Sequence, residues 1–383
     1  MIDQRRVEKL LQDLVQIESV NPDLVAGGSG ETRIAGYVAD TLKRAGVVAR
    51  VDEIAPRRAN VVATLAGRRN GRTLMLNGHL DTVGIEGMHD PFSGRLEDDR
   101  LYGRGAQDMK GGLAAALVAI ETLVQEGLET GQVVLTAVAD EEYRSLGTRA
   151  LLDSGVRADA AIVLEPTALE VATAHKGFAW AEVGTVGRAA HGSRPQEGRD
   201  AILHMGRVLS GIEELERELS LRPTHPLLGR GSVHASLISG GQELSSYPAR
   251  CEVSLERRLL PGEDGSTFER ELNEIVNTLS QADPRFQAHS VITYAAPALE
   301  TPREAPIAKA LFDSARAVVG GRARFGAASF WTDAALLDGA GIPSVLFGPG
   351  GDGLHSSVEY VNLEDVVLVA EVLVRCVRNF CPT

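Results

Sequence analysis

The first part of the chain alternates between two patterns of apolar residues. Residues 3–18 and 31–46 carry apolar side chains at helical spacing, and Gly46 is placed to end the second helix. Residues 112–125 form an alanine-rich segment typical of a buried helix. Short apolar runs typical of strands lie at 60–65, 73–76, 132–139 and 160–164. This alternation predicts an α/β fold, with a mostly parallel sheet flanked by helices on both faces.

The pattern changes near His175. From there the spacing predicts, in order, a strand at 177–186, a helix at 199–218, strands at 232–239 and 249–259, a helix at 266–281 and a strand at 286–295. This β-α-β-β-α-β order is that of a ferredoxin-like fold. After Pro297 the first pattern resumes, with a helix at 305–319, a strand at 344–347 and a helix at 363–379. We therefore predict one domain formed by residues 1–174 and 296–383, with an α+β domain inserted at 175–295.

Composition narrows the class of protein. A chain of 383 residues is too long for one ordinary core, so two domains are expected. The formal net charge of −13 argues against nucleic-acid binding, which needs a basic surface. No apolar run is long enough to cross a bilayer, and the first residues lack the apolar core of a signal peptide. The cysteines are too few and too scattered for a disulfide framework (Cys251, Cys376, Cys381), so we expect a cytoplasmic protein with no membrane contact.

Side chains that can bind metal gather at the ends of the predicted strands, and this is the strongest functional signal. The set comprises His79 and Asp81, Glu141 and Glu142, Glu165, Asp108 in a loop before the alanine-rich helix, and His355 after a strand and a glycine-rich turn. Open α/β sheets place functional residues at the carboxyl ends of their strands. We therefore expect these segments to converge on one crevice, although Asp81 or Asp108 taken alone could simply cap a helix.

The residue types indicate which metal would bind. Nitrogen and oxygen donors without thiolate suit zinc, with cobalt or manganese as substitutes. Five protein ligands fit a pair of metals that shares one carboxylate. Asp81 has the spacing to orient His79, because a metal-bound imidazole usually gives its other N–H to an acceptor. Of the adjacent Glu141 and Glu142, one can bind metal while the other takes a proton from water. The glycines of GRGAQD (103–108) are not spaced as G-x-G-x-x-G and resemble a phosphate loop only superficially, so we do not predict nucleotide binding.

Together the segments resemble the metallopeptidase family that contains acetylornithine deacetylase, succinyl-diaminopimelate desuccinylase and bacterial glutamate carboxypeptidase. The matching segments are SVNP (19–22), GHLDTV (78–83), DPFSGRLEDDRLYGRGAQDMKGG (90–112), DEE (140–142), LEP (164–166), AAHGSRPQEGRDAI (189–202), RRLLPGED (257–264) and GPGGDGLHSSVEYV (348–361). They follow the family order along nearly the whole chain. The inserted domain resembles the lid or dimerisation domain of that family.

The resemblance implies a role for each candidate residue. It implies that one zinc is held by His79, Asp108 and Glu165, and the other by Asp108, Glu142 and His355, with Asp108 bridging. It implies that Glu141 is the general base and that Asp81 orients His79. On the inserted domain, His191 resembles the residue that polarises the substrate carbonyl, and Arg258 the residue that binds the substrate carboxylate. It also implies a cis peptide bond between Asp108 and Met109.

Two further segments are expected to contact substrate. Gly348 and Gly350 belong to the glycine-rich turn before His355. Ser245 stands where the family usually has asparagine in an N-x-x-P stretch, and this departure affects substrate contacts rather than metal chemistry. The resemblance also implies a homodimer through the inserted domain, with the edge-like run SVHASLISG pairing two sheets and His191 serving the partner's site. Alternatively, His191 serves its own subunit or caps a turn, and Arg258 pairs with Glu256 or Glu263.

The function that we predict is hydrolysis of the amide bond of a small N-acyl amino acid or a short peptide-like substrate. The alternatives are a glutamate-carboxypeptidase-like exopeptidase or a dipeptidase. A dizinc aminopeptidase fits less well, because such enzymes lack the inserted β-α-β-β-α-β domain. A catalytically silent binding protein would have lost Glu141 or a ligand, and all of these residues are present.

Overall fold

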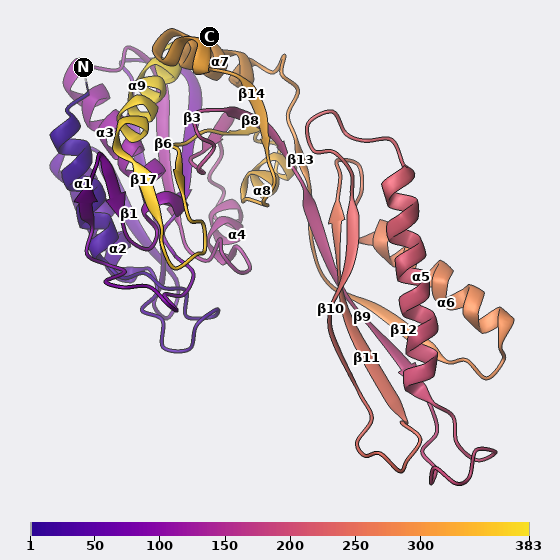
Figure 1. The fold of residues 1–383 in the computed structure, drawn as a ribbon. Coiled ribbons are helices and arrows are strands. Elements are labelled where there is room, and N and C mark those ends of the chain that lie inside the picture. Colours follow the sequence, from indigo (N-terminus) through magenta and orange to yellow (C-terminus); the bar gives the residue numbers. More distant parts are fainter. Residues whose placement is uncertain (1, 383) are drawn as a thin grey trace. The chain divides into compact units, whose positions relative to one another are not determined.

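The structure is a computed structural model that describes residues 2–382. The chain divides into two compact units (Figure 1). The first unit comprises Met1–Thr173, Thr301–Ala327 and Thr332–Thr383. The second unit comprises Ala174–Glu300 and Ala328–Trp331. The chain therefore leaves the first unit after Thr173, returns to it at Thr301, and contributes Ala328–Trp331 to the second unit once more.

The largest sheet has nine strands in the order β1-β2-β6-β3-β7-β15-β8-β13, with β14 paired to β8. Its strands are β1 (Val48–Ala55), β2 (Arg58–Ala66), β3 (Arg69–His79), β6 (Thr130–Val138), β7 (Ala160–Val163), β8 (Val171–His175), β13 (Leu299–Glu300), β14 (Phe325–Ala328) and β15 (Ser344–Leu346). The four central strands β6, β3, β7 and β15 run parallel to one another. The outer pairs β1–β2, β2–β6, β15–β8 and β13–β8 are antiparallel. The predicted mostly parallel sheet is thus confirmed in its centre.

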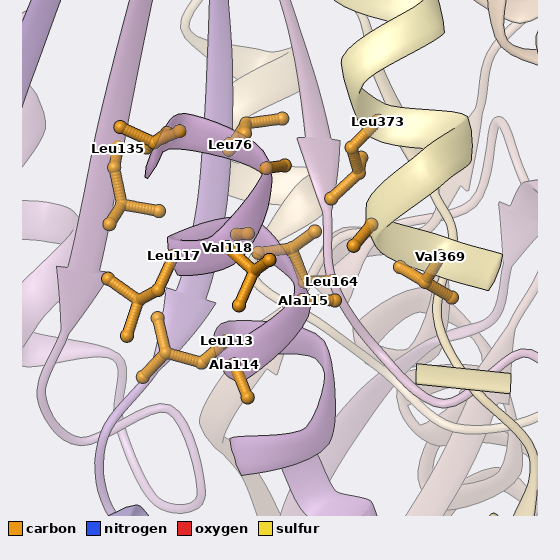
Figure 2. Close-up of a cluster of buried hydrophobic side chains, with 14 of the residues drawn as sticks. Leu76, Leu113, Ala114, Ala115, Leu117, Val118, Leu135, Leu164, Val369 and Leu373 are labelled. Atoms are coloured by element: carbon orange, nitrogen blue, oxygen red, sulfur yellow. The ribbon is translucent and has the colours of Figure 1, made fainter. Parts of the chain in front are cut away.

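Helices flank this sheet, and the core lies between them and the strands. The helices are α1 (Gln4–Gln16), α2 (Thr32–Arg44), α3 (Gly111–Glu126), α4 (Leu146–Asp153), α7 (Pro306–Val319), the short 3₁₀ turn η2 (Gly320–Arg322), α8 (Ala334–Gly339) and α9 (Leu363–Phe380). Helices α1 and α9 pack with α3, and α7 packs with α9. Helices α4 and α8 pack with each other, α4 also against β2 and α8 against β7 and β15. Figure 2 shows side chains of α3 between leucines of β3 and β6 and residues of α9.

Helix α3 is buried along most of its length because small residues let the strands and α9 approach closely. Leu113 and Leu117 are fully buried with Leu76 and Leu135. Burial of each such leucine stabilises the fold by about 1.5–3 kcal/mol. At Gly112 a Cβ atom would lie 2.0 Å from the carbonyl oxygen of Leu164, so only glycine allows this contact. The first turn of α3 therefore lies against the end of β7.

A small antiparallel sheet in the first unit brings together two segments that are far apart in the sequence. Its strand order is β16-β17-β5-β4. The strands are β4 (Arg95–Glu97), β5 (Arg100–Tyr102), β16 (Gly351–Asp352) and β17 (Tyr360–Asn362). Pairing of β5 with β17 places the loop after Tyr102 beside the loop before Tyr360. Sequence patterns missed these strands, because runs of two or three residues carry no periodicity.

The second unit is a four-stranded antiparallel sheet in the order β10-β11-β9-β12, with two helices packed on it. Its elements follow the chain order β9 (Gly177–Val186), α5 (Ala201–Leu221), β10 (Ser232–Gly240), β11 (Arg250–Leu259), α6 (Gly265–Ala282) and β12 (Ala288–Ala296). Helix α5 begins at Asp200, whose carboxylate accepts the N–H of Leu203, and α6 begins with a capping box at Asp264. This is the ferredoxin-like order that the sequence predicts.

Candidate metal centre

Three adjacent parallel strands deliver most of the candidate ligands. His79 is the last residue of β3. Glu165 follows the end of β7, and Glu141 and Glu142 follow the end of β6. Because β6, β3 and β7 are neighbours in the sheet and run in the same direction, their carboxyl ends meet at one edge.

Asp108 comes from the segment that leads into α3. It lies in the segment η1 (Ala106–Lys110), where its own backbone is not helical (φ −114°, ψ 95°), and its peptide bond to Met109 is cis. This confirms the cis bond that the family resemblance implies. The Met109 sulfur lies 3.1 Å from the backbone nitrogen of His79, so the turn is anchored to the end of β3.

The carboxylate of Asp108 lies between the two histidines. His79 Nε2 is 3.0 Å from Asp108 Oδ1, and His355 Nε2 is 3.4 Å from Asp108 Oδ2. On the first side, Glu165 Oε1 is 3.9 Å from His79 Nε2. On the second side, Glu142 Oε2 is 3.1 Å from His355 Nε2. The arrangement thus has two groups of donors, with one oxygen of Asp108 in each.

The electrostatics of the cluster are those of a cation site. Burial, together with mutual repulsion, raises the pKa of Glu141 and Glu165 well above the usual value and that of Glu142 to about 7. Contacts with Asp108 and Glu142 raise the pKa of His355 to about 10. For Asp108, burial acts against ionisation, but the two histidines hold its pKa below the usual range. Several buried carboxylates around one point favour a bound cation.

The donor set fits a bound metal ion. His79, Asp108 and Glu142 each offer a donor atom within 4.8 Å of the other two. Among residues 2–382, the buried oxygens without a hydrogen-bond partner include Oε1 of Glu142 and Oε1 of Glu165. Buried oxygens of this kind need a partner, and imidazole and carboxylate donors are those that zinc prefers.

Asp81 supports this centre in a way that the sequence predicts only in part. His79 Nδ1 is 2.9 Å from the carbonyl oxygen of Asp81 and 3.6 Å from its carboxylate. A carbonyl can only accept, so Nδ1 carries a proton, and Nε2 is the ring nitrogen that faces Asp108. The Asp81 carboxylate itself accepts the backbone N–H groups of Glu141 and Glu142, at 3.1 and 3.2 Å. Asp81 therefore orients His79 through its main chain and holds the Glu141–Glu142 turn through its side chain.

Behind Asp81 lies a buried polar network that the sequence did not reveal. Asn21 Nδ2 donates to Asp81 at 2.8 Å and to Asp140 at 3.0 Å. Arg58 pairs with Asp140 at 2.8 Å and with Glu31 at 2.9 Å. Arg58 begins an apolar strand and Asn21 lies in the SVNP segment, but no pattern links positions so far apart in the chain.

The remaining candidates of the first unit are the two glycines of the turn before His355. Both are buried. A Cβ atom at Gly348 would lie 2.2 Å from the Glu165 carbonyl oxygen, and one at Gly350 would lie 2.7 Å from an Asp365 carboxylate oxygen. Close packing therefore explains both glycines, and their contact with substrate stays a prediction.

The second unit brings His191 and Ser245 together. The backbone N–H of Gly192 donates to the Ser245 carbonyl at 2.7 Å. The N–H of Ser193 donates to His191 Nδ1 at 3.2 Å, so this nitrogen is an acceptor and Nε2 carries the proton. Arg258 lies on β11 of the same unit, where its Nε donates to Glu256 at 2.7 Å and its guanidinium lies over the Phe178 ring. One of the two alternative ion pairs for Arg258, that with Glu256, is thus present.

Known proteins are similar to this chain over most of its length. Residues 75–379 match peptidase family M20/M25/M40. The chain is 32% identical to acetylornithine deacetylase of Myxococcus xanthus, over 97% of this chain and 96% of that protein. It is 28% identical to N-formyl-4-amino-5-aminomethyl-2-methylpyrimidine deformylase of Bacillus subtilis, over 99% and 97%.

Solved structures share the fold. A tripeptidase of Staphylococcus aureus superposes with a TM-score of 0.82 at 20% identity, covering 99% of this chain and 98% of the tripeptidase. A dinuclear metal binding peptidase of Bacillus subtilis, also from family M20, superposes with a TM-score of 0.75 at 16% identity, covering 97% of each chain.

This chain belongs to peptidase family M20/M25/M40, which confirms the family resemblance. It is a hydrolase that acts on amide or peptide bonds. None of the helices between residues 2 and 382 is long and apolar enough to cross a membrane.

Proposed function

We propose that this chain is a dinuclear zinc amidohydrolase that removes the acyl group from a small N-acyl amino acid. The observation that carries the proposal is Asp108, whose two carboxylate oxygens each face a different histidine at 3.0 and 3.4 Å. His79, Asp108 and Glu165 would hold one zinc, and Asp108, Glu142 and His355 the other. Cobalt or manganese would substitute, because their preferred donors overlap with those of zinc.

A zinc pair bound here would act as a Lewis acid toward the amide carbonyl and toward water. Glu141 is the proposed general base, because its carboxylate interacts electrostatically with Glu165 and His79 and its backbone is held by Asp81. Its pKa, raised well above the usual value by burial and by the Glu165 charge, suits a group that takes a proton from water and returns it to the leaving amine.

Two residues of the second unit are proposed to act on substrate. His191 would donate from Nε2 to the oxyanion that forms on the amide carbonyl, and this tautomer is favoured by the Ser193 N–H on Nδ1. Arg258 would bind the substrate carboxylate through its two terminal nitrogens, since Glu256 engages Nε. Ser245, beside His191, would contact the substrate as well.

We also propose a homodimer through the second unit, with His191 serving the partner's site. Strand β10 lies at the edge of its sheet, and Leu237 and Ile238 on it are 71% and 58% exposed. An open edge with exposed apolar residues favours pairing with a second copy. The alternative is that His191 serves its own subunit.

Mixing two inactive variants distinguishes these arrangements. In a heterodimer of His191→Ala and Glu141→Ala, action in trans leaves one site complete. Random subunit exchange should then restore about one quarter of wild-type activity, because half of the dimers are mixed. No activity after exchange, or a chain that is monomeric in solution, would contradict the trans arrangement.

A substrate panel tests the proposed reaction. It would contain N-acetyl, N-succinyl and N-formyl amino acids and free dipeptides, each assayed with zinc and with cobalt. The N-formyl compounds belong in the panel because a deformylase is among the similar proteins. We expect kcat/KM to be highest for an N-acyl amino acid with a free carboxylate. Preference for unmodified dipeptides would instead favour an exopeptidase or dipeptidase.

A further inference from the structure

We propose that Glu359 is a positioning residue for the metal centre: with Arg104, it fixes the loops of Asp108 and His355 so that both histidines reach the shared carboxylate. This inference rests on the proposed function and assigns a role to two residues that do not bind metal themselves. Both side chains are buried, with Arg104 3% and Glu359 1% exposed.

The Glu359 carboxylate accepts four hydrogen bonds, three of them from the backbone of the Asp108 loop. Its Oε1 accepts the N–H groups of Gln107 at 2.9 Å and Asp108 at 3.1 Å. Its Oε2 accepts the N–H of Gly105 at 3.0 Å and Arg104 Nη1 at 2.7 Å. The peptide plane that precedes the bridging aspartate is therefore held directly by a side chain from the far end of the sequence.

Arg104 extends the same contact to two other ligand-bearing segments. Its Nη2 donates to the carbonyl of Ser356, next to His355, at 2.9 Å. Its Nε donates to the carbonyl of Gly84, in the segment that follows His79 and Asp81, at 2.8 Å. A planar guanidinium can satisfy three acceptors at fixed angles, which a lysine ammonium does less well.

The backbone around this pair leaves little freedom for another arrangement. The N–H of Gly103 donates to the Glu359 carbonyl at 3.1 Å, next to the β5–β17 ladder. Gly105 has φ of +81°, and a Cβ atom there would lie 2.7 Å from the Thr82 side chain. The loop is thus a tight turn whose inward N–H groups need an acceptor, and the Glu359 carboxylate is that acceptor.

The consequence for metal binding follows from this geometry. In Glu359→Gln, the side-chain NH₂ group would face at least one backbone N–H that now donates to a carboxylate oxygen. The Asp108 loop would have to move, and the two donor groups that share Asp108 would no longer be held together. Partners that orient metal ligands typically contribute 10–100-fold to metal affinity.

The test measures zinc affinity directly, by competition with a chelator of known affinity, in wild type and Glu359→Gln. We expect two zinc ions per wild-type chain and a 10–100-fold weaker affinity for at least one of them in the variant. The matched control is Glu121→Gln. Glu121 accepts two hydrogen bonds from Arg6 in the same unit, at 2.9 and 2.6 Å, but no candidate ligand is among its hydrogen-bond partners.

A second variant, Arg104→Lys, keeps the positive charge and is expected to weaken zinc binding in the same direction. If Glu359→Gln does not fold, Arg104→Lys tests the positioning role instead. Wild-type zinc affinity in the folded variant, or an equal loss in Glu121→Gln, would overturn the positioning role. Failure of the wild-type chain to bind two zinc ions would instead overturn the proposed dinuclear centre.

Discussion

In the first unit, the side chains of His79 and Glu165 are only 1% and 4% exposed. Asp81 and Asp108 each take part in hydrogen bonds with segments that are distant in the sequence. In the second unit His191 is exposed and Arg258 keeps about a third of its side chain in contact with solvent. The Nδ1 atoms of the two histidines also have opposite hydrogen-bonding roles. Nδ1 of His79 donates to a carbonyl, whereas Nδ1 of His191 accepts from a backbone N–H.

This difference separates two kinds of functional residue. Most of the proposed metal ligands are held by buried contacts within the chain, which fix their geometry before a metal binds, whereas His355 keeps 54% of its side chain exposed. Residues that contact substrate need access, so their side chains remain partly exposed and hold only local partners. Substitutions in the first unit should therefore change metal binding or the chemical step, and substitutions in the second should change substrate interactions without loss of metal.

Replacement of Glu141 by glutamine should have the largest effect on turnover. General-base catalysis typically contributes about 10²–10⁴-fold, so kcat should fall by that factor. Because Glu141 is proposed not to be a ligand, the variant should still bind two zinc ions. Metal analysis of the purified variant checks this, and loss of one equivalent would mean that Glu141 and Glu142 have exchanged roles.

His191 and His79 offer the sharpest contrast between the units. His191→Ala should lower kcat by about 10²–10³-fold, the typical effect of removing one oxyanion donor, with zinc content unchanged. His79→Ala should lose zinc as well as activity. If His191→Ala also bound less zinc, the separation of roles between the units would be wrong.

Arg258→Lys should have a smaller effect, confined to substrates with a carboxylate. A point charge replaces a planar fork and one charge-assisted hydrogen bond is lost, so KM should rise about tenfold. Initial-rate kinetics over the substrate panel measure this effect. If wild type and Arg258→Lys had equal kinetic parameters, Arg258 would not bind substrate and its role would be limited to the ion pair with Glu256.

The buried network behind Asp81 should affect how the free energy of unfolding depends on pH. Burial, and next the charge of Asp81, raise the pKa of Glu31 from 4.5 to about 8. Between these values the unfolded chain loses this proton and the folded chain keeps it, so the contribution of Glu31 to stability falls as pH rises. Glu31→Gln cannot ionise and should give a shallower fall in the free energy of unfolding from pH 5 to 8. Parallel curves for the two proteins, from urea denaturation at constant saturating zinc, would argue against a raised pKa.

The sequence predicts those parts of the fold and of the candidate site that rest on local patterns of residues. Strand β9 spans the residues 177–186 that alternation predicts, and the ends of β3, β6 and β7 carry the expected ligands. Both follow from local patterns. The small sheet of β4, β5, β16 and β17 was missed because its strands have only two or three residues.

Side-chain partners could not be predicted for a different reason. Glu359 and Arg104 both lie in motifs that identify the family, but nothing in those motifs indicates that they form an ion pair across 255 positions of the sequence. The same holds for Arg58 and Asp140, which are 82 positions apart. Such contacts depend on tertiary packing, and a single sequence records only the residues and not their pairing.

The most direct test of the shared carboxylate is a zinc titration of the metal-free chain, followed by mass spectrometry under native conditions, for wild type and Asp108→Ala. If Asp108 bridges two ions, wild type binds two zinc ions per chain and the substitution weakens both sites. Binding of a single zinc ion by wild type, or loss of only one of two sites in Asp108→Ala, would contradict the dinuclear centre.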